Sequence, residues 1–343
     1  MHNIVFSVLT IAACAVPATA GDIICSLGRL WPYSRYIQFP DSDGNLYNVD
    51  LETEPDKNLI NELAEEPSKY NQYLLYTRRN PEDAQTLIFN DGESIANSYF
   101  NPNVSTAIIA HGWISSQYSH LNPTIRDAYL NKEDANIIVL DWSKIAANFY
   151  STAVAAVPHV GRGLGQFLIF LSEATGTSFS RMHIIGHSLG GHLVGNAGRT
   201  IKNEANKLAS RITALDPAGP CWYNNKDGLY PTDAKYVEAI HTNAGMYGID
   251  KEVGIANFYP NGGIVQPGCD ILENSCSHNR AWELFAASVT YNRFIGRKCK
   301  DADEAKENIN CIGEEFFMGN DKLEKFGIGE YNLKTKGNYP YYE

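Results

Sequence analysis

Residues 182–191 read MHIIGHSLGG, and this stretch decides the expected fold. A short apolar run, Met182–Ile185, leads into the pattern Gly-x-Ser-x-Gly at 186–190, and a helix-like segment follows. A serine between two glycines at a strand-to-helix junction is typical of a nucleophile elbow, in which a sharp turn raises the hydroxyl above the edge of a sheet. An ordinary glycine-rich turn is the alternative, because a short motif is a hypothesis until its surroundings support it. Ser188 is therefore a candidate nucleophile.

The chain on both sides of Ser188 alternates between strand-like and helix-like segments. Short apolar runs predict strands, and apolar residues at helical spacing predict helices. The expected strands are 106–110, 136–140, 182–185 and 212–215, and the expected helices are 160–174 and 191–208. Strands that alternate with helices of this length form a mainly parallel sheet covered by helices on both faces. The sequence thus predicts the α/β class, and the elbow specifies an α/β-hydrolase fold.

A serine hydroxyl needs a general base, and the base needs an anionic partner. In this fold the chain order is serine, then acid, then histidine. Asp216 ends the strand ITAL and His278 follows in loop-like sequence, so we assign Asp216 as the acid and His278 as the base. A turn-forming Asp-Pro pair is the alternative for Asp216. Four other histidines lie upstream of Asp216 or at a strand end and are interpreted as packing or supporting residues: His183, His187, His192 and His241.

Ester hydrolysis also needs N–H donors where negative charge develops on the carbonyl oxygen, and loss of one donor costs about 10²–10³ in turnover. The amide after the nucleophile, that of Leu189, is the first expected donor. The second should come from a loop after an early strand, and the segment AIIAHGW at 107–113 places Trp113 there. The Trp113 side chain could pack in the core or line an acyl pocket, and the two roles are compatible.

The first residues have the features of a cleaved secretory leader. Residues 4–16 form an apolar run of thirteen, and Ala18 and Ala20 supply the small side chains of a cleavage site. We expect a signal peptide at 1–20 and a single secreted, extracellular domain at 21–343. We expect no later segment of membrane-spanning length.

The composition is acidic, with 39 Asp and Glu residues against 28 Lys and Arg and a net charge of −11. Because no basic run occurs, nucleic acid is not an expected partner. Residues 21–70 are interpreted as an acidic, irregular extension across the domain. The sequon NVS at 103–105 predicts glycosylation of Asn103 in a surface loop.

Six of the seven cysteines lie after the leader, and this even number predicts three disulfides in an oxidising compartment. Cys269 and Cys276 are close enough in sequence to pair, and so are Cys299 and Cys311. Cys25 and Cys221 then form the third pair by elimination.

The motifs together resemble the catalytic domain of the pancreatic-lipase family, and they are especially similar to insect secreted lipases and phospholipases A1. They occur in the family's order along nearly the whole mature chain: YLLYTRRNP (73–81), AIIAHGW (107–113), VLDW (139–142), HIIGHSLGGH (183–192), ITALDPAGP (212–220), DAKYVEAIHT (233–242), FYPNGG (258–263) and CSHNRA (276–281). The resemblance implies Ser188 as nucleophile, Asp216 as acid and His278 as base. It also implies the backbone amides of Trp113 and Leu189 as the oxyanion hole.

Two loops depart from the family's triacylglycerol lipases. The lid between the cysteines that match Cys269 and Cys276 shrinks to DILENS, and the loop that matches 243–256 is also short. Since six residues are too few to cover an acyl groove, we expect an open site in which the disulfide fixes the backbone beside His278. Family members with both loops short tend to be phospholipases A1, which implies release of the sn-1 fatty acid from phosphatidylcholine-type lipids. Triacylglycerol (neutral) lipase or galactolipase activity is the alternative.

The resemblance also bears on cofactors and partners. In the segment that matches the family's structural calcium site only Asp233 could bind the ion, and calcium takes about six to eight oxygen ligands. We therefore expect no metal and no other cofactor. The expected partner is a lipid aggregate or membrane surface, without a colipase-type protein, and the oligomeric state is left open. Phe149, Tyr150 and Tyr247 are candidates for contact with lipid or for ordinary packing.

A hypothesis of another class remains. Insect yolk proteins resemble this family and use the fold for binding or storage without catalysis, typically with the nucleophile lost. Here Ser188, Asp216 and His278 are all present, which favours an enzyme.

Overall fold

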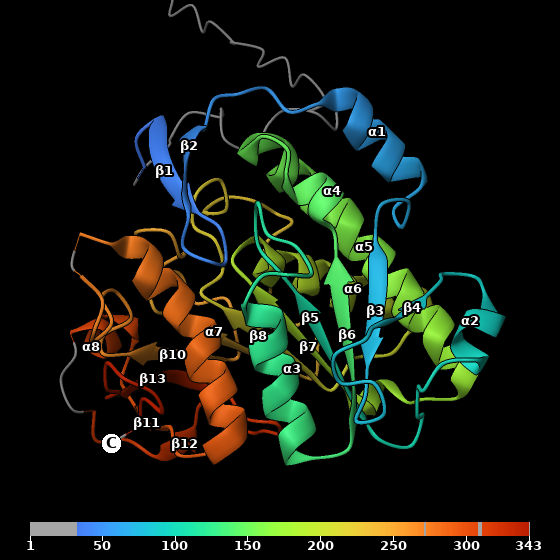
Figure 1. The fold of residues 1–343 in the computed structure, drawn as a ribbon. Helices are drawn as coiled ribbons and strands as arrows, with labels where there is room; N and C mark the ends of the chain where they lie inside the picture. Colours follow the sequence, from blue (N-terminus) through green and yellow to red (C-terminus); the bar gives the residue numbers. More distant parts are fainter. Residues whose placement is uncertain (1–32, 271, 308–310, 343) are drawn as a thin grey trace, which may run out of the picture.

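The computed structural model describes residues 33–270, 272–307 and 311–342, which form one large sheet and a separate two-stranded hairpin (Figure 1). From one edge to the other, the strands of the large sheet are β12 (Glu315–Phe317), β11 (Ile295–Lys298), β13 (Gly329–Leu333), β10 (Ala256–Pro260), β9 (Tyr236–Ile240), β8 (Arg211–Leu215), β7 (Met182–His187), β5 (Ser105–Ala110), β6 (Ala135–Asp141), β3 (Gln72–Tyr76) and β4 (Gln85–Leu87). The strands from β13 to β6 run parallel, and the outer strands pair antiparallel. This arrangement confirms the predicted mainly parallel sheet.

The centre of the sheet brings the functional segments to one edge. β7 and β8 are buried along their whole length, as expected for parallel strands covered on both faces. The strand register pairs Ala110 with Gly186, His187 with Leu215, and Leu215 with Ile240. Because these strands are parallel, the segments that follow them meet at the carboxyl edge, where ligands bind in open α/β sheets.

Helices cover both faces, as predicted. α5 and α6 pack together on one face, and α3 and α7 pack together on the other (Figure 1). The helices are α1 (Lys57–Glu65), α2 (Gly92–Ala96), α3 (Leu121–Lys132), α4 (Ser143–Ala146), α5 (Tyr150–Thr175), α6 (Leu189–Ala205), α7 (Asn274–Tyr291) and α8 (Ala302–Lys306), with a 3₁₀ turn at Phe179–Arg181.

Helix α5 is longer than the predicted segment at 160–174. Pro158 lies inside it, and a proline in that position usually ends a helix, which hid the first turns in the sequence pattern. The helix continues through Pro158 while Val157 and Val160 are both fully buried. Contrary to expectation, α5 is long and apolar enough to cross a membrane, but 61% of its most apolar window is buried inside the fold, as in a core helix.

The expectation of an irregular segment at 21–70 is wrong where the structure describes it. The separate hairpin consists of β1 (Tyr36–Pro40) and β2 (Leu46–Asp50), and α1 follows. The Asp41 carboxylate closes the turn by accepting hydrogen bonds from the N–H groups of Asp43 and Asn45, each at 2.9 Å. This is Asx-turn chemistry, which the alternating residues around DSDGN could have indicated. The predicted leader at 1–20 lies outside the described residues.

Two of the predicted disulfides are present. Their Cα–Cα distances are 5.5 Å for Cys269–Cys276 and 5.0 Å for Cys299–Cys311. Cys25 lies outside the described residues, so its pairing with Cys221 stays a prediction. Asn103 is exposed in the turn before β5, and its glycosylation also stays a prediction.

Candidate active site

Ser188 lies at the junction of β7 and α6 in a strained backbone conformation. Its φ is +57° and its ψ is −121°, which turns the side chain sharply out of the strand direction. A Cβ on Gly186 would lie 2.1 Å from the Gly190 carbonyl oxygen, and a Cβ on Gly190 would lie 2.4 Å from the Ala110 carbonyl oxygen. Only glycine fits at either position, so the two glycines of the motif make this elbow possible.

Asp216 and His278 form a buried pair beside the elbow. The His278 Nδ1 atom lies 2.6 Å from Asp216 Oδ2, and neither side chain has any exposed surface. The other oxygen of Asp216 accepts hydrogen bonds from the backbone N–H groups of Thr242 and Asn243, at 2.8 and 3.0 Å. These donors hold the carboxylate in place, so it can orient the imidazole and stabilise the imidazolium.

The expectation that His278 lies in a loop is wrong. His278 belongs to the second turn of α7, which begins at Asn274 inside the short loop closed by Cys269 and Cys276. Arg280 donates to the Pro267 carbonyl at 2.7 Å and holds the start of this helix against the loop. The disulfide thus fixes the first turn of the helix that carries the base.

Ser188 and His278 are both buried near the end of β8, where the Ser188 N–H donates to the Leu215 carbonyl and His278 contacts Asp216. Ser188 Oγ and His278 Nε2 are both inaccessible to solvent, and neither has a hydrogen-bond partner among the described residues. The rings of His187 and His278 lie 4.7 Å apart, and His187 Nε2 lies 3.3 Å from the His278 carbonyl oxygen. Buried polar atoms are almost always paired, so two adjacent unpaired ones indicate groups reserved for a ligand or a reaction.

The loop after β5 lies directly above the serine. A Cβ on Gly112 would lie 3.0 Å from Ser188 Cβ and 3.5 Å from Ser188 Oγ. Among the described residues, the backbone N–H groups of Trp113 and Leu189 donate no hydrogen bond. Two free amides beside a serine hydroxyl are what an oxyanion hole requires. The indole N–H of Trp113 donates to the Asn148 carbonyl at 2.8 Å, which fixes the side chain.

A buried hydrogen-bonded pair, His111 and Asp141, which the sequence analysis did not predict, supports this loop. His111 Nε2 lies 3.3 Å from Asp141 Oδ1, and the indole of Trp142 donates to the His111 carbonyl at 2.9 Å. Burial raises the pKa of Asp141, but the hydrogen bonds from His111 and Ser143 outweigh it and lower the pKa to about 2. The paired histidine and aspartate at the ends of neighbouring strands, in AHGW and LDW, were the available signal.

The four histidines interpreted as packing or supporting residues are all buried. His183 lies 2.7 Å from both Tyr129 Oη and Thr213 Oγ1. Burial lowers the pKa values of His183, His187 and His241, and takes that of His192 to about 4. None of the four contacts Asp216 by a hydrogen bond among the described residues, so His278 is the imidazole that the geometry assigns to the acid.

The expectation of an open site is wrong. The loop between Cys269 and Cys276 is short, but the β1–β2 hairpin covers the site instead. The ring of Phe39 has no exposed surface and lies 5.7 Å from the His278 ring and 6.1 Å from the Trp113 ring. Of the aromatics proposed to touch lipid, Phe149 is exposed, Tyr150 is buried and Tyr247 is partly buried.

Residues 45–338 match the Lipase family model. The chain belongs to the lipase family. It is 30% identical over 313 residues to human pancreatic triacylglycerol lipase, covering 77% of this chain and 66% of the relative. It is 35% identical over 260 residues to pancreatic lipase-related protein 2 of Cavia porcellus (73% and 58%), and 32% identical over 306 residues to lipoprotein lipase of Neovison vison (78% and 63%). This lipase-family chain therefore spans about three-fifths to two-thirds of the length of these curated relatives.

The residues that match the family's calcium site do not fit a cation in this lipase-family chain. The Asp233 carboxylate accepts hydrogen bonds from Arg199 Nε at 3.2 Å and Arg199 Nη2 at 2.9 Å. The same guanidinium donates to the Gly228 carbonyl at 2.7 Å, and the Tyr230 N–H donates to Asp233. An arginine thus supplies the positive charge at the point where a metal would need oxygen ligands.

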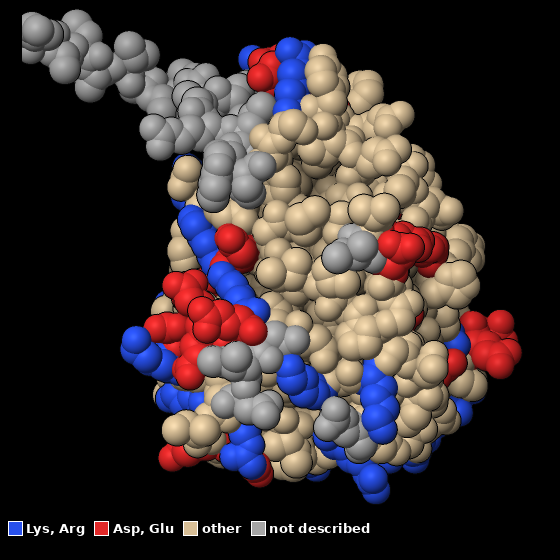
Figure 2. Space-filling view, turned by 90° about the vertical axis from the view of Figure 1, so that its left-hand side faces the viewer, with Lys and Arg blue, Asp and Glu red and all other residues tan. Residues whose placement is uncertain are grey.

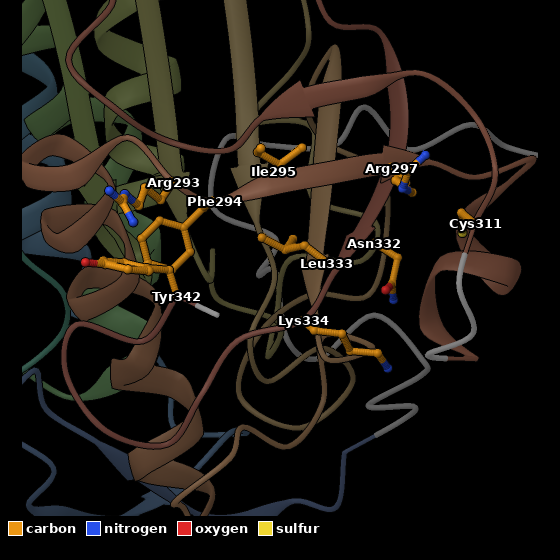
Figure 3. Close-up of a pocket in the computed structure, with 9 residues that line it drawn as sticks. All are labelled: Arg293, Phe294, Ile295, Arg297, Cys311, Asn332, Leu333, Lys334 and Tyr342. Carbon is orange, nitrogen blue, oxygen red and sulfur yellow. The ribbon is translucent and has the colours of Figure 1, made fainter.

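A hollow between β11 and β13 of this lipase-family chain has no part in the site. Figure 3 shows cationic and aromatic side chains around it. Arg297 is paired with Glu315, and the Arg293 guanidinium lies 5.1 Å from the centre of the Tyr342 ring. The residues that line it are Arg293, Phe294, Ile295, Arg297, Cys311, Asn332, Leu333, Lys334 and Tyr342. None of them is a residue of the candidate triad, so the chemistry is confined to the carboxyl edge of the sheet.

Proposed function

We propose that this chain is a secreted serine hydrolase of lipid esters. The observation that carries the proposal is the buried Asp216–His278 pair at the end of the strand next to the strained Ser188, with the Ser188 Oγ and His278 Nε2 atoms both buried and unpaired among the described residues. The two disulfides between described cysteines support an oxidising, extracellular location. The non-catalytic alternative does not account for two unpaired polar atoms at the centre of the fold.

The reaction follows from these positions. Ser188 Oγ attacks the ester carbonyl carbon while His278 Nε2 takes the hydroxyl proton, and Asp216 stabilises the resulting imidazolium. The Trp113 and Leu189 amides donate to the oxyanion. His278 then gives its proton to the leaving alkoxide, which departs as the alcohol and leaves an acyl-enzyme. Water repeats the sequence, with His278 taking its proton, and the fatty acid leaves as Ser188 regains its hydrogen.

Within this class, a phospholipase A1 is the better supported function. Only six residues separate Cys269 from Cys276, and three of the six belong to α7 or its N-cap, so this loop cannot extend over an acyl groove. Once the covering β1–β2 hairpin is displaced, such an edge would leave room for a phosphate-bearing head group, and the products would be the sn-1 fatty acid and a 2-acyl lysophospholipid. Triacylglycerol hydrolysis is the second candidate because relatives with that printed name match most of the chain. Neither candidate uses a metal or a colipase-type partner, and both act at a lipid aggregate or membrane surface.

The test is fatty-acid release by the mature protein from phosphatidylcholine vesicles, a triacylglycerol emulsion and a galactolipid dispersion, with Ser188→Ala as the control. Release from the sn-1 position of phosphatidylcholine, lost in the control, is the expected result. Faster release from triacylglycerol or galactolipid would keep the enzyme and replace the substrate. Failure of a fluorophosphonate to label Ser188, even with lipid present, would contradict hydrolysis and favour lipid binding without catalysis.

A further inference from the structure

The β1–β2 hairpin is a separate element with two unlike faces. Within the part of the chain that the structure describes, its strands pair only with each other and do not join the large sheet. Phe39 and Val49 point inward and are buried, while Tyr36 and Leu46 point outward with 67% and 46% of their surfaces exposed. A two-stranded hairpin has little stability of its own, so this element keeps its place through what its inner face contacts.

The inner face packs on the candidate active site. The Phe39 ring lies 5.0 Å from the Tyr150 ring, 5.1 Å from the Tyr247 ring and 5.7 Å from the His278 ring, measured between centroids. Tyr47 of the opposite strand lies 5.9 Å from Trp113. Phe39 therefore fills the apolar space beside the base and the oxyanion loop, where an acyl chain bound to Ser188 would have to begin.

Hydrogen bonds join the hairpin tip to residues close in sequence to Trp113, Ser188 and His278. The Ser42 N–H donates to Ser115 Oγ at 2.9 Å, and Ser42 Oγ lies 3.2 Å from His187 Nδ1. Asn279 donates to the Asp41 carbonyl at 3.3 Å. Ser115 is two residues after Trp113. His187 directly precedes Ser188, and Asn279 directly follows His278. The tip is thus held down at all three catalytic segments.

An exposed bond completes these tip contacts. Asp43 Oδ1 accepts hydrogen bonds from both the backbone N–H and Nδ1 of His120, each at 2.8 Å. The His120 side chain is 79% exposed, and such a surface contact contributes at most about 1 kcal/mol. The tip is therefore attached through a few polar contacts of modest strength, and ester substrate cannot reach the covered Ser188 Oγ unless some part of this cover moves.

Exposed apolar side chains lie on segments that contact the hairpin. Phe149 and Met246 are 71% and 43% exposed, and each is next in sequence to an aromatic residue that touches Phe39, namely Tyr150 and Tyr247. Tyr118, 83% exposed, lies two residues before the His120 contact. Figure 2 shows a broad uncharged area at the centre of one face, with charged side chains mostly along its left and lower margins. Exposed apolar residues on several segments that contact one hairpin fit a lipid surface better than water.

We propose that the β1–β2 hairpin is the lid of this protein and that it opens when the surrounding apolar residues meet a lipid surface. In the closed state Phe39 occupies the start of the acyl path. In the open state the apolar inner face of the hairpin, with Phe39 and Val49, is buried in lipid, which offsets the loss of its contacts with the core. The proposal rests on the proposed function, because a lid is needed only if an ester reaches Ser188.

A disulfide across the exposed tip contact tests the proposal. The double variant Asp43→Cys/His120→Cys, oxidised, ties the hairpin to the loop after β5, and the two single variants are the matched controls. We expect the cross-linked protein to release fatty acid from phosphatidylcholine vesicles at least about tenfold more slowly than the single variants, with recovery after mild reduction. Full activity of the cross-linked protein would overturn the lid. Loss of activity in the reduced double variant and in the wild type alike would instead contradict the proposed function.

Two further measurements do not depend on turnover. A polarity-sensitive fluorophore on Leu46→Cys in a Ser188→Ala background should report an apolar environment when vesicles are added. The same fluorophore on Lys207→Cys, an exposed position just beyond the far end of α6, should not. Phe39→Ala should speed labelling of Ser188 by a fluorophosphonate in the absence of lipid, whereas Phe89→Ala, which removes a remote aromatic contact with Phe170, should not. No fluorophore response would show that the hairpin does not meet the lipid surface, and labelling of Phe39→Ala no faster than that of the wild type would show that Phe39 does not block the path to Ser188; either result would overturn the proposal.

Discussion

Two buried charged clusters lie at opposite ends of β8, and they differ in how completely their polar atoms are paired. At the carboxyl end, the Asp216–His278 pair leaves Nε2 without a partner beside an equally unpaired Ser188 hydroxyl. At the amino end, the carboxylate of Glu238 accepts hydrogen bonds from Arg211, Thr213 and Lys325.

The cluster at the amino end uses nearly all of its capacity within the chain. The Lys325 ammonium donates to Glu238 at 2.7 Å and to the Phe317 and Gly319 carbonyls at 2.7 and 3.0 Å. Burial raises the pKa of Glu238, but Arg211 and Lys325 outweigh it and hold that pKa below its ordinary value. A satisfied cluster stabilises the fold, whereas an unsatisfied one keeps atoms available for chemistry, so pairing separates the two roles better than burial does.

The largest expected effect is on catalysis at the unsatisfied cluster. His278→Gln keeps a polar side chain but removes the base, and we expect turnover of the preferred lipid to fall by about 10³–10⁴ or more. The readout is activity per folded molecule, because the variant also loses the buried 2.6 Å contact between Nδ1 and Asp216 and should be less stable than the wild type. A variant that folds and keeps a tenth of the activity would contradict the assignment of a catalytic role to the cluster at the carboxyl end of β8.

The satisfied cluster should respond in the opposite way. Glu238→Gln removes the negative charge between Arg211 and Lys325, and breaking a buried ion pair from one side costs about 3–5 kcal/mol. Urea unfolding with the disulfides intact should show this loss, while the activity per folded molecule stays near that of the wild type. The matched control is Glu315→Gln, which removes the exposed partner of Arg297 and should cost at most about 1 kcal/mol.

Low pH should reduce the free energy of unfolding through His192. Unlike His278, His192 has a hydrogen-bond partner at both ring nitrogens. His192 Nε2 lies 2.8 Å from the Ala218 carbonyl oxygen, and its Nδ1 accepts from the Leu229 N–H at 3.2 Å. Burial lowers the pKa of His192 to about 4, below its ordinary 6.5. Between these two pH values the imidazole is protonated in the unfolded chain and neutral in the folded chain.

This difference fixes the direction of the pH effect. The free energy of unfolding should fall as pH drops from about 6.5 to about 4, by about 3 kcal/mol for this residue alone, and be unaffected by it above pH 7. Chemical unfolding at a series of pH values measures the slope. His192→Gln should be less stable near pH 7 but lose less stability toward pH 4, and an unchanged slope would contradict the assignment.

The smallest expected effect concerns the support of the oxyanion loop. Asp141→Asn keeps the size of the side chain and removes the charge that pairs with His111. Because the loop amides would still be present but less firmly placed, we expect kcat to fall about tenfold with KM nearly unchanged, less than the loss of a donor itself. A rise in KM with constant kcat would instead assign Asp141 to substrate binding.

The sequence predicted the parts of the molecule that depend on local pattern and strand order. Ser188, Asp216 and Trp113 follow three neighbouring parallel strands, and the apolar runs located those strands to within two residues. His278 was identified as the base from the order of the catalytic residues along the chain. That order does not predict secondary structure, so the sequence analysis expected a loop at His278, which lies in α7.

The cover over the site could not be predicted in the same way. The hairpin is recognisable from its turn chemistry, but its docking position depends on contacts such as that between Asp41 and Asn279, which are 238 residues apart. Lid length was judged from the loop between Cys269 and Cys276 alone, since a single sequence shows the length of a loop and not which other segment lies above it.

The long sequence separation between Asp41 and Asn279 also implies that the hairpin docks late during folding. During synthesis the hairpin leaves the ribosome long before α7, so it has no His278, Tyr247 or Asn279 to pack against until most of the chain has emerged. The central strands can form before that point, whereas Phe39 lacks part of its packing surface until α7 has been made. A nascent chain stopped before residue 274 would therefore lack a closed site, and closure would be one of the last steps of maturation.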